Sequence, residues 1–348
     1  MKKLAVIIVA AIASLFSCGK EDYSDYDLPG DCDGKCEFVS DMNSFRDAVA
    51  NSAAQFSNCI CMEKGLIEGE ITVSKTLNII GRKDRTSMLK NISFFNAQNV
   101  LVSDITFQNI SVNDSAMFIS GSSVKLENVV FSNIRAASLF GGRAVVISGE
   151  RSDVSFENVR IEKTDGTGLL IDGSHEISVI SSNFSDCGFA GIWVQNSRET
   201  SGMLRVSDTV LNDNGAVSLQ ILGSTNLEIA DSQINGVRKR EINMEVVGDG
   251  IVVKNRMMTK EGSVSIKNLK VTGFERAGMI FDGDSDSILN GIVLENISIT
   301  SENGQFGAVV QNGKEPSEFR NGIDQNEFTQ NDKNLTSPLY LIETIQEM

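Results

Sequence analysis

Several residue types that build enzyme and sugar-binding sites are scarce in this sequence. Its 348 residues include one histidine, one tryptophan, three tyrosines and three prolines. The single histidine, His175, lies in Ser-His-Glu with no serine or cysteine motif around it, so we expect a surface turn residue and no catalytic base. All three tyrosines fall outside the repeats described below, which leaves Trp193 as the expected aromatic platform for a sugar ring. A buried, structural Trp193 is the alternative.

Positive charge is also in short supply. Lysine and arginine number 31 against 46 aspartate and glutamate residues, for a net charge of −15. Such a chain repels polyanions at long range, so we expect no nucleic-acid partner. An anionic polysaccharide would be repelled as well, unless metal ions or a local basic patch intervened.

One pattern recurs eight times between Val100 and Ser301: two alternating apolar residues, a polar residue, and a third apolar residue. Its second apolar position recurs every 23 to 37 residues, at Val102, Leu126, Phe156, Val179, Val206, Ile229, Ile266 and Leu294. The alternation places both apolar side chains on one face of a strand. A strand-based repeat of this length predicts a solenoid in which each copy is one coil and the apolar faces form one column.

The polar position follows two residues later, at Asp104, Asn128, Asn158, Ser181, Asp208, Asp231, Asn268 and Asn296. We expect it at a turn, where stacked amides and carboxyls hydrogen-bond along the solenoid. A second apolar run, such as Gly168-Leu-Leu-Ile-Asp, separates the copies and predicts two or three strands in each coil. The prolines all lie outside the repeats, as laddered strands require.

With these features the chain resembles the right-handed parallel β-helix proteins of the pectate-lyase-like group, over roughly residues 37–312. The resemblance implies an all-β fold, a right-handed parallel β-helix solenoid with a short N-terminal capping helix. Phe38, Phe45, Ala48 and Val49 have helical spacing, which suits such a cap. We assign residues 37–80 to the N-terminal cap and first coil, 81–312 to the β-helix, and 313–348 to a C-terminal cap or tail.

The N-terminus carries an export signal. Residues 1–17 have two lysines followed by an apolar run, which is typical of a signal peptide. Leu15-Phe16-Ser17-Cys18 resembles the lipobox of bacterial lipoproteins, which implies that Cys18 is lipidated; an ordinary secretory cleavage site is the alternative. Residues 18–36 are polar and predict a flexible tether. We expect a monomer at the outer membrane, facing the cell exterior and touching the membrane only through its lipid.

Four of the six cysteines lie close together in the sequence, at Cys32, Cys36, Cys59 and Cys61. In an exported chain they are expected to form two disulfides near the cap, with the pairing open. Zinc binding is the alternative, although their spacing is uncommon for zinc. Cys187 is expected to be a buried free thiol.

The catalytic signatures of the pectate-lyase-like group are missing, since the sequence has neither Gly-His-Gly nor Arg-x-Pro-x-x-Arg. Asp172 and Asp282 are predicted to lie four coils apart, too far for the carboxylate pair of a glycosidase, which needs about 5–9.5 Å. The best local cluster is Asp249, Lys254 and Asp282, which we expect on adjacent coils. A solvated ladder of ion pairs is the alternative.

Two further groups suggest ligands. Asp282, Asp284 and Asp286 have the oxygen ligands that Ca²⁺ prefers, but they fail the EF-hand pattern, and a solvated acidic turn is the alternative. No other cofactor is expected. The longest insertion between repeats is basic, so we expect a ligand along the face that carries it, with these residues: Trp193, Gln195, Gln220, Arg238, Lys239 and Arg240. Local pairing of the basic residues with nearby glutamates is the alternative.

The sequence thus supports two hypotheses. The first is a lipid-anchored, surface-exposed β-helix protein that binds a glycan or another extracellular ligand without catalysis. The second is a polysaccharide lyase or glycoside hydrolase with an atypical active site near Asp249, Lys254 and Asp282. The fold alone does not decide between them, because one fold hosts many functions.

Overall fold

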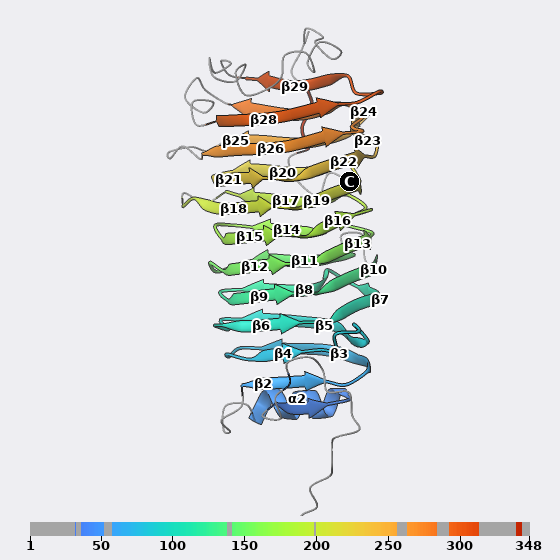
Figure 1. Ribbon diagram of the computed structural model, residues 1–348, viewed down its shortest axis with the longest axis vertical. Helices are drawn as coiled ribbons and strands as arrows, with labels where there is room; N and C mark the ends of the chain where they lie inside the picture. The colour runs from blue at the N-terminus through green and yellow to red at the C-terminus, as the bar shows by residue number, and fades with distance from the viewer. Residues whose placement is uncertain are drawn as a thin grey trace, which may run out of the picture.

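The computed structural model describes residues 32, 36–51, 58–137, 141–197, 200–255, 263–283, 292–312 and 339–342. These residues form an all-β, right-handed parallel β-helix, as predicted, with coils stacked along one axis (Figure 1). The predicted signal peptide, Cys18, Asp284, Asp286 and most of residues 313–348 lie outside the described residues. Within the described part, no helix is both long and apolar enough to span a membrane.

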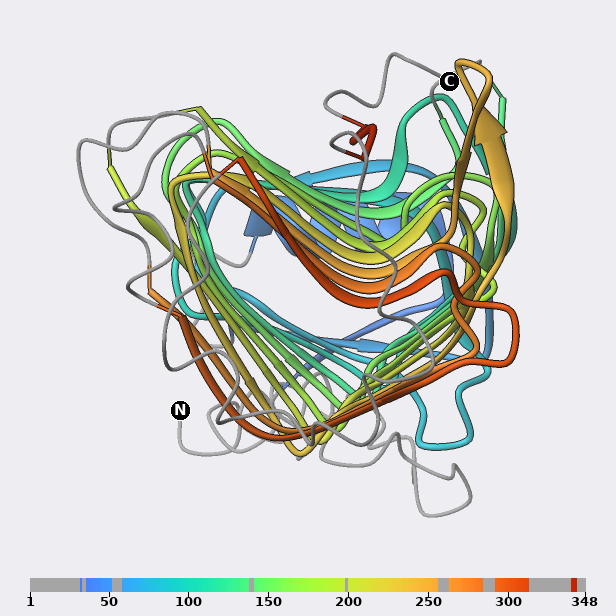
Figure 2. The ribbon, with the colours of Figure 1, turned by 90° about the horizontal axis from the view of Figure 1, so that it is seen from above.

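Each coil contributes strands to three parallel stacks, which surround the interior seen end-on in Figure 2. The first stack contains β1 (Glu37–Val39), β2 (Cys59–Met62), β4 (Asn78–Ile80), β6 (Val100–Ser103), β9 (Ser123–Glu127), β12 (Asp153–Glu157), β15 (Glu176–Ile180), β18 (Gly202–Ser207) and β21 (Thr225–Ala230). The second contains β7 (Thr106–Val112), β10 (Val130–Ala136), β13 (Arg160–Thr164), β16 (Asn183–Ser185), β19 (Val210–Asn214) and β22 (Gln233–Val237). The long strands β26 (Val264–Thr272) and β28 (Ile292–Thr300) continue both of these stacks.

The third stack carries the surfaces discussed below. It contains β3 (Gly65–Val73), β5 (Ser87–Phe95), β8 (Ser115–Ser120), β11 (Arg143–Ser148), β14 (Leu169–Asp172), β17 (Ala190–Asn196), β20 (Val217–Gly223), β25 (Asp249–Asn255), β27 (Ala277–Gly283) and β29 (Phe306–Gln311). In the described part, the only antiparallel pair is the hairpin of β23 (Arg240–Ile242) and β24 (Glu245–Val247), which falls in the basic insertion.

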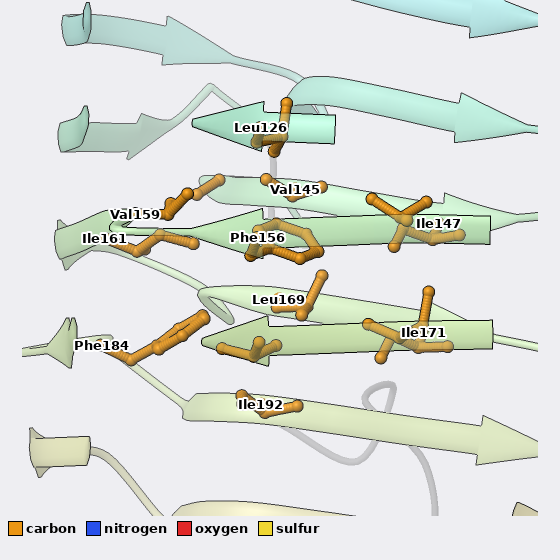
Figure 3. Packing of buried hydrophobic residues seen from close by; sticks show 14 of the residues in the cluster. Leu126, Val145, Ile147, Phe156, Val159, Ile161, Leu169, Ile171, Phe184 and Ile192 are labelled. Carbon is orange, nitrogen blue, oxygen red and sulfur yellow. The ribbon is translucent and has the colours of Figure 1, made fainter. Parts of the chain in front are cut away.

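The predicted register of the first stack is confirmed. Val102 aligns with Leu126, Leu126 with Phe156, and the series continues coil by coil to Leu294. Each of these side chains is at most 8% exposed. They meet inward-pointing residues of the other two stacks, such as Ile147 and Ile161, in one continuous core (Figure 3). Burying a side chain of this size stabilises the fold by about 1.5–3 kcal/mol.

The polar position of the repeat lies at a turn, as expected, and has a further property. All eight residues have a positive φ, between 49° and 56°. Asparagine and aspartate tolerate this left-handed conformation better than other residues with a side chain, because their short polar groups bond locally. Asn158 donates to Asn128 Oδ1 at 2.6 Å, and Asn296 donates to Asn268 Oδ1 at 2.8 Å. The repeat therefore selects this residue type for backbone conformation as well as for hydrogen bonding.

The N-terminal end is closed by helix α2 (Met42–Asn51), which buries Phe45 and Ala48 against the first coils. Two disulfides, Cys32–Cys61 and Cys36–Cys59, brace this end. Both the capping helix and the expectation of two disulfides are confirmed, and all four predicted sulfurs are engaged in them. The pairing, which the sequence left open, joins the segment before β1 to β2.

Candidate functional site

An open cleft lies on the outer side of the third stack, near the N-terminal end of the solenoid. It encloses about 570 Å³, within the usual range for small-ligand sites. Strands β3, β5 and β8 form its floor, and the turn between β7 and β8 forms one side. The lining residues are Gly69, Glu70, Thr72, Lys90, Asn91, Ser93, Phe95, Ser111, Val112, Asn113, Asp114, Ser115 and Phe118.

Strand alternation and one irregularity place these side chains outside the coil. Thr72 aligns with Ser93, and Ser93 aligns with Phe118, so the three form one outward column. The register between β3 and β5 shifts between Ile67 and Glu70, and such an irregularity interrupts the regular alternation of side chains. As a result, Lys90 and Asn91 both line the cleft between two inward-pointing residues of β5.

Two phenylalanines give the cleft an aromatic wall. The ring centroids of Phe95 and Phe118 are 5.4 Å apart, with an angle of 37° between the planes. Phe95 is 41% exposed and Phe118 is partly exposed, so both rings present surface to solvent. Exposed aromatic rings beside polar groups suit a ligand that has an apolar face and a hydroxylated rim.

The charged groups around the cleft balance one another. Asp114 forms an ion pair with Arg143 at 2.5 Å. Glu70 and Lys90 line the cleft without a hydrogen-bond or ion-pair partner among the described residues. Asn91 Nδ2 donates to the carbonyl of Ser115 at 2.9 Å. The negative charges of Glu70 and Asp114 are balanced by the positive charges of Lys90 and of Arg143, the partner of Asp114. The cleft is therefore neutral overall and suits a neutral polar ligand better than a polyanion.

The residues predicted for ligand binding lie elsewhere, toward the C-terminal end of the third stack. Trp193 is on the outward side of β17, but it is fully buried, packed on Phe189 with ring centroids 5.0 Å apart. It belongs to a second apolar cluster outside the coil, together with Leu341 and Ile342. Gln220, one coil further, is also buried and donates to the carbonyl of Ile342 at 2.5 Å. The alternative that Trp193 is buried is therefore correct, and neither Trp193 nor Gln220 is exposed to a ligand at this face.

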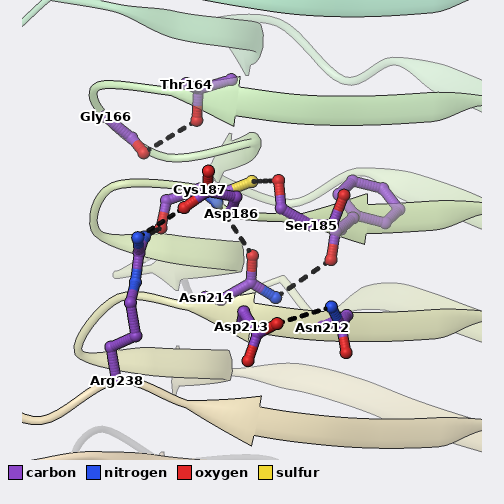
Figure 4. Close-up of polar contacts among 10 residues, drawn as sticks. Thr164, Gly166, Ser185, Asp186, Cys187, Asn212, Asp213, Asn214 and Arg238 are labelled. Atoms are coloured by element: carbon purple, nitrogen blue, oxygen red, sulfur yellow. Dashed lines mark hydrogen bonds and ion pairs between the residues drawn. The ribbon is translucent and has the colours of Figure 1, made fainter.

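The other predicted ligand residues are more accessible. Gln195 aligns with Asp172 and Leu222 in the predicted outward column and is partly exposed. Arg238, Lys239 and Arg240 are exposed, but Arg238 pairs with Asp186 and donates to the carbonyl of Cys187 at 2.9 Å (Figure 4). Burial lowers the pKa of Arg240, with a further contribution from the Arg238 charge. Among the described residues, Lys239 and Arg240 have no acidic ion-pair partner, and Arg238 pairs with an aspartate of an earlier coil.

Asp249, Lys254 and Asp282 do not form one cluster. Asp249 begins β25 and accepts two hydrogen bonds from Arg276, at 2.5 and 2.9 Å. Lys254, five residues along the strand, pairs with Asp282 at 3.3 Å. The two pairs are about 16 Å apart along the strand direction. The expectation that Asp249 and Asp282 meet around Lys254 is therefore wrong. Asp249 and Lys254 lie five residues apart on β25, and Asp282 pairs with Lys254 at the far end of that strand.

Both ion pairs are buried, so the alternative of a solvated ladder is also wrong. Among the described residues, the buried lysine, arginine and aspartate side chains are Asp249, Lys254, Arg276 and Asp282. Burial raises the pKa of Asp249, against the opposing effect of the Arg276 guanidinium. Asp282 also accepts from Asn312 at 2.5 Å. With Asp284 and Asp286 outside the described residues, the Ca²⁺ expectation stays a prediction.

The structure also places His175 and Cys187, the remaining two residues considered in the sequence. His175 is buried, and the expectation of a surface position is wrong: its Nδ1 accepts from the Ser152 backbone at 3.1 Å, and its Nε2 lies 3.0 Å from the Asp172 carbonyl. These contacts assign it a structural role. Cys187 is a buried free thiol, as predicted, and burial raises its pKa to about 12.

The sequence analysis missed the cleft itself. Alternation already required that one of the adjacent residues Phe94 and Phe95 point outward, and the same holds for Met117 and Phe118. Phe94 and Met117 are buried inside the coil, so Phe95 and Phe118 are the outward members. The scarcity of tryptophan and tyrosine drew attention away from phenylalanine, which occurs 18 times in the chain.

Comparison with known proteins gives the class of fold. A model of the right handed beta helix region matches residues 90–257. No curated protein matches the chain. Among solved structures, the chain is similar to pectate lyase Pel9A, with 15% identity, TM-score 0.39, and coverage of 77% of this chain and 72% of that chain. It is also similar to PfbA, a surface adhesin of Streptococcus pneumoniae, with 11% identity, TM-score 0.29, and coverage of 84% and 92%.

A third similar structure is the catalytic domain of a GH87 alpha-1,3-glucanase, with 10% identity, TM-score 0.35, and coverage of 86% of this chain and 70% of that chain. With TM-scores below 0.5 and identities of 15% or less, these similarities carry no conclusion about the fold or the activity of this chain.

Proposed function

We propose that this protein is a lipid-anchored, surface-exposed β-helix protein that binds a neutral glycan in the cleft between β3, β5 and β8, without catalysis. The observation that carries the proposal is the exposed aromatic pair, Phe95 and Phe118, set in a cleft of about 570 Å³ with polar groups around it. Sugar rings pack their C–H faces on aromatic rings and hydrogen-bond through their hydroxyls.

The polar groups supply the second half of such a contact. Glu70, Lys90, Asn91, Thr72 and Ser93 offer both donors and acceptors around the rings. They project from β3 and β5, which pair with each other, and β5 also pairs with β8, so the site is preorganised and a ligand orders few side chains on binding. The balanced charge favours neutral sugars over uronates, in a chain whose net charge is −15.

The test is a panel of neutral and uronate oligosaccharides, with binding measured by calorimetry and cleavage measured as new reducing ends or unsaturated uronates. Phe95→Ala should weaken a bound neutral glycan about 5–150-fold, the effect of losing an aromatic contact of about 1–3 kcal/mol. Leu66→Ala is the matched control, because Leu66 has the same 41% exposure but does not line the cleft. Equal affinity of both variants would place the ligand elsewhere, and turnover of any polymer would favour the enzyme hypothesis.

The anchor is tested separately. We expect Cys18→Ala to move the protein from the membrane fraction to the soluble fraction, because the lipid is the proposed membrane contact. Phe95→Ala serves as the control and should stay with the membrane. If Cys18→Ala stays with the membrane, that result contradicts lipidation at this residue. It does not bear on the proposed glycan site.

A further inference from the structure

The outer face of the third stack near its C-terminal end is covered by the chain's own residues Leu339–Ile342. In Figure 2 this dark red segment lies outside the coils, beside the inward-curved side of the solenoid. The segment has no regular secondary structure, yet Leu341 and Ile342 are only 5% and 4% exposed. Both side chains are therefore buried against this face.

Side chains from β20, from β29 and from the residue before β27 bind the backbone of this segment. Gln311 of β29 both accepts from the Leu339 amide at 2.7 Å and donates to its carbonyl at 3.1 Å. Arg276 donates to the Tyr340 carbonyl at 2.7 Å, and Gln220 of β20 donates to the Ile342 carbonyl at 2.5 Å. Contacts of this kind recognise an extended peptide through its main chain and place few demands on its sequence.

The face beneath is preorganised for such a contact. Arg276 is buried and fixed by its paired hydrogen bonds to Asp249, so its remaining nitrogen is already oriented when a carbonyl arrives. The floor between these polar groups is apolar, formed by Trp193, Val252, Ile280 and Val309, and the hairpin β23–β24 adds Ile242 and Val247 to the same cluster. The result is a groove with an apolar floor and amide-reading side chains along it.

The resident segment leaves this groove incompletely satisfied. Trp193 Nε1 is a buried donor without a hydrogen-bond partner in the described structure. Native proteins rarely leave such a group unpaired, and among the described residues Leu339–Ile342 does not satisfy this donor.

We propose that the outer face of β20, β25, β27 and β29 is a main-chain-reading peptide groove, and that Leu339–Ile342 is its exchangeable intramolecular occupant. The groove takes an extended, uncharged peptide with apolar side chains, of which the chain's own C-terminal segment is one example. This site is distinct from the glycan cleft, which lies near the opposite end of the third stack.

The chain offers a direct probe, because Trp193 is its only tryptophan. In the full chain, acrylamide quenching of Trp193 fluorescence should be weak. Leu341→Asp places a charge in the apolar groove and should raise the quenching constant severalfold by releasing the segment. Met244→Asp is the matched control, since Met244 is 91% exposed on the hairpin, and it should leave quenching unchanged.

A fluorescently labelled synthetic peptide of residues 337–342, amidated at its C-terminus so that it is uncharged there, then tests exchange. It should bind the Leu341→Asp variant at least tenfold more tightly than the unmodified chain, because the competing intramolecular segment is gone. Adding Gln311→Ala to that variant should weaken the peptide about tenfold, through loss of two main-chain hydrogen bonds. Where Leu341→Asp does not fold, Leu341→Ala replaces it with the same expectations.

Three results would overturn the proposal. Quenching of Leu341→Asp equal to that of the unmodified chain would show that the segment does not cover Trp193. If Leu341→Asp exposes Trp193 but does not bind the peptide, the segment is a fixed part of the fold. If the peptide binds equally well with and without Gln311→Ala, it binds elsewhere. A dimer of the unmodified chain that Leu341→Asp dissociates would assign the occupant to a second copy.

Discussion

Ser181 is the position at which the turn ladder departs from its own rule, and we expect Ser181→Asn to stabilise the protein. Of the eight equivalent residues, seven are asparagine or aspartate, and Ser181 shares their left-handed backbone with φ of 50°. The left-handed conformation raises the free energy of a residue with a side chain by about 1–2 kcal/mol. The increase is smaller for asparagine, because its side chain forms local hydrogen bonds. Ser181 is exposed, so the larger side chain meets no packed core.

The size of the gain follows from the neighbouring rungs. Asn158, one coil earlier, already donates to Asn128 and keeps an acceptor oxygen on the ladder. An asparagine at position 181 would donate to that oxygen, as Asn268 donates to Asp231 Oδ1 at 2.7 Å. The backbone relief of about 0.5–1 kcal/mol and one exposed hydrogen bond of about 0.5–1 kcal/mol together give about 1–2 kcal/mol. For a solenoid of a few hundred residues this raises the Tm by about 2–4 °C.

Thermal unfolding followed by circular dichroism measures the effect. Ser178→Asn is the control, because Ser178 lies in the extended strand β15, where asparagine gains nothing from the backbone. A Tm increase confined to Ser181→Asn supports the reasoning. Equal Tm values for the two variants, or a loss of stability at position 181, would refute it.

Two further predictions concern the interior. Leu204 is fully buried between Ile177 and Leu227, so Leu204→Asp should lower the free energy of unfolding by about 4 kcal/mol or more. The control Ser178→Asp should change it by about 0.5 kcal/mol. A urea midpoint of Leu204→Asp near that of the unmodified chain would show that the register is wrong. Because burial raises the pKa of the Cys187 thiol to about 12, iodoacetamide at pH 8 should label it only after denaturation, and rapid labelling of the folded chain would contradict its burial.

Much of the fold was predictable because its governing interactions repeat. Each inward position from Val102 to Leu294 recurs once a coil, so the alternation and the interval together predict both the strand face and the neighbour on the next coil. The outward column through Asp172, Gln195 and Asp282 was predictable for the same reason. The two disulfides were predictable from the clustered cysteines together with the expectation that the chain is exported.

The candidate site was not predictable in the same way. Alternation indicates that Phe95 points out of the coil, but not that the turn before β8 leaves it uncovered beside Phe118. The same argument placed Trp193 outward correctly but left its burial open, because the cluster that contains it includes the hairpin residues and Leu341 and Ile342, far away in the sequence.

The sequence by itself determined the coil: which residues face inward, where each turn lies, and why asparagine or aspartate occupies it. These features depend on neighbours one repeat away, and a periodic chain carries that information in its spacing. Only the tertiary structure decided which outward residues meet solvent. That depends on segments outside the repeat, such as Leu339–Ile342, whose place on the solenoid is set by contacts with Gln220, Arg276 and Gln311 and not by any period.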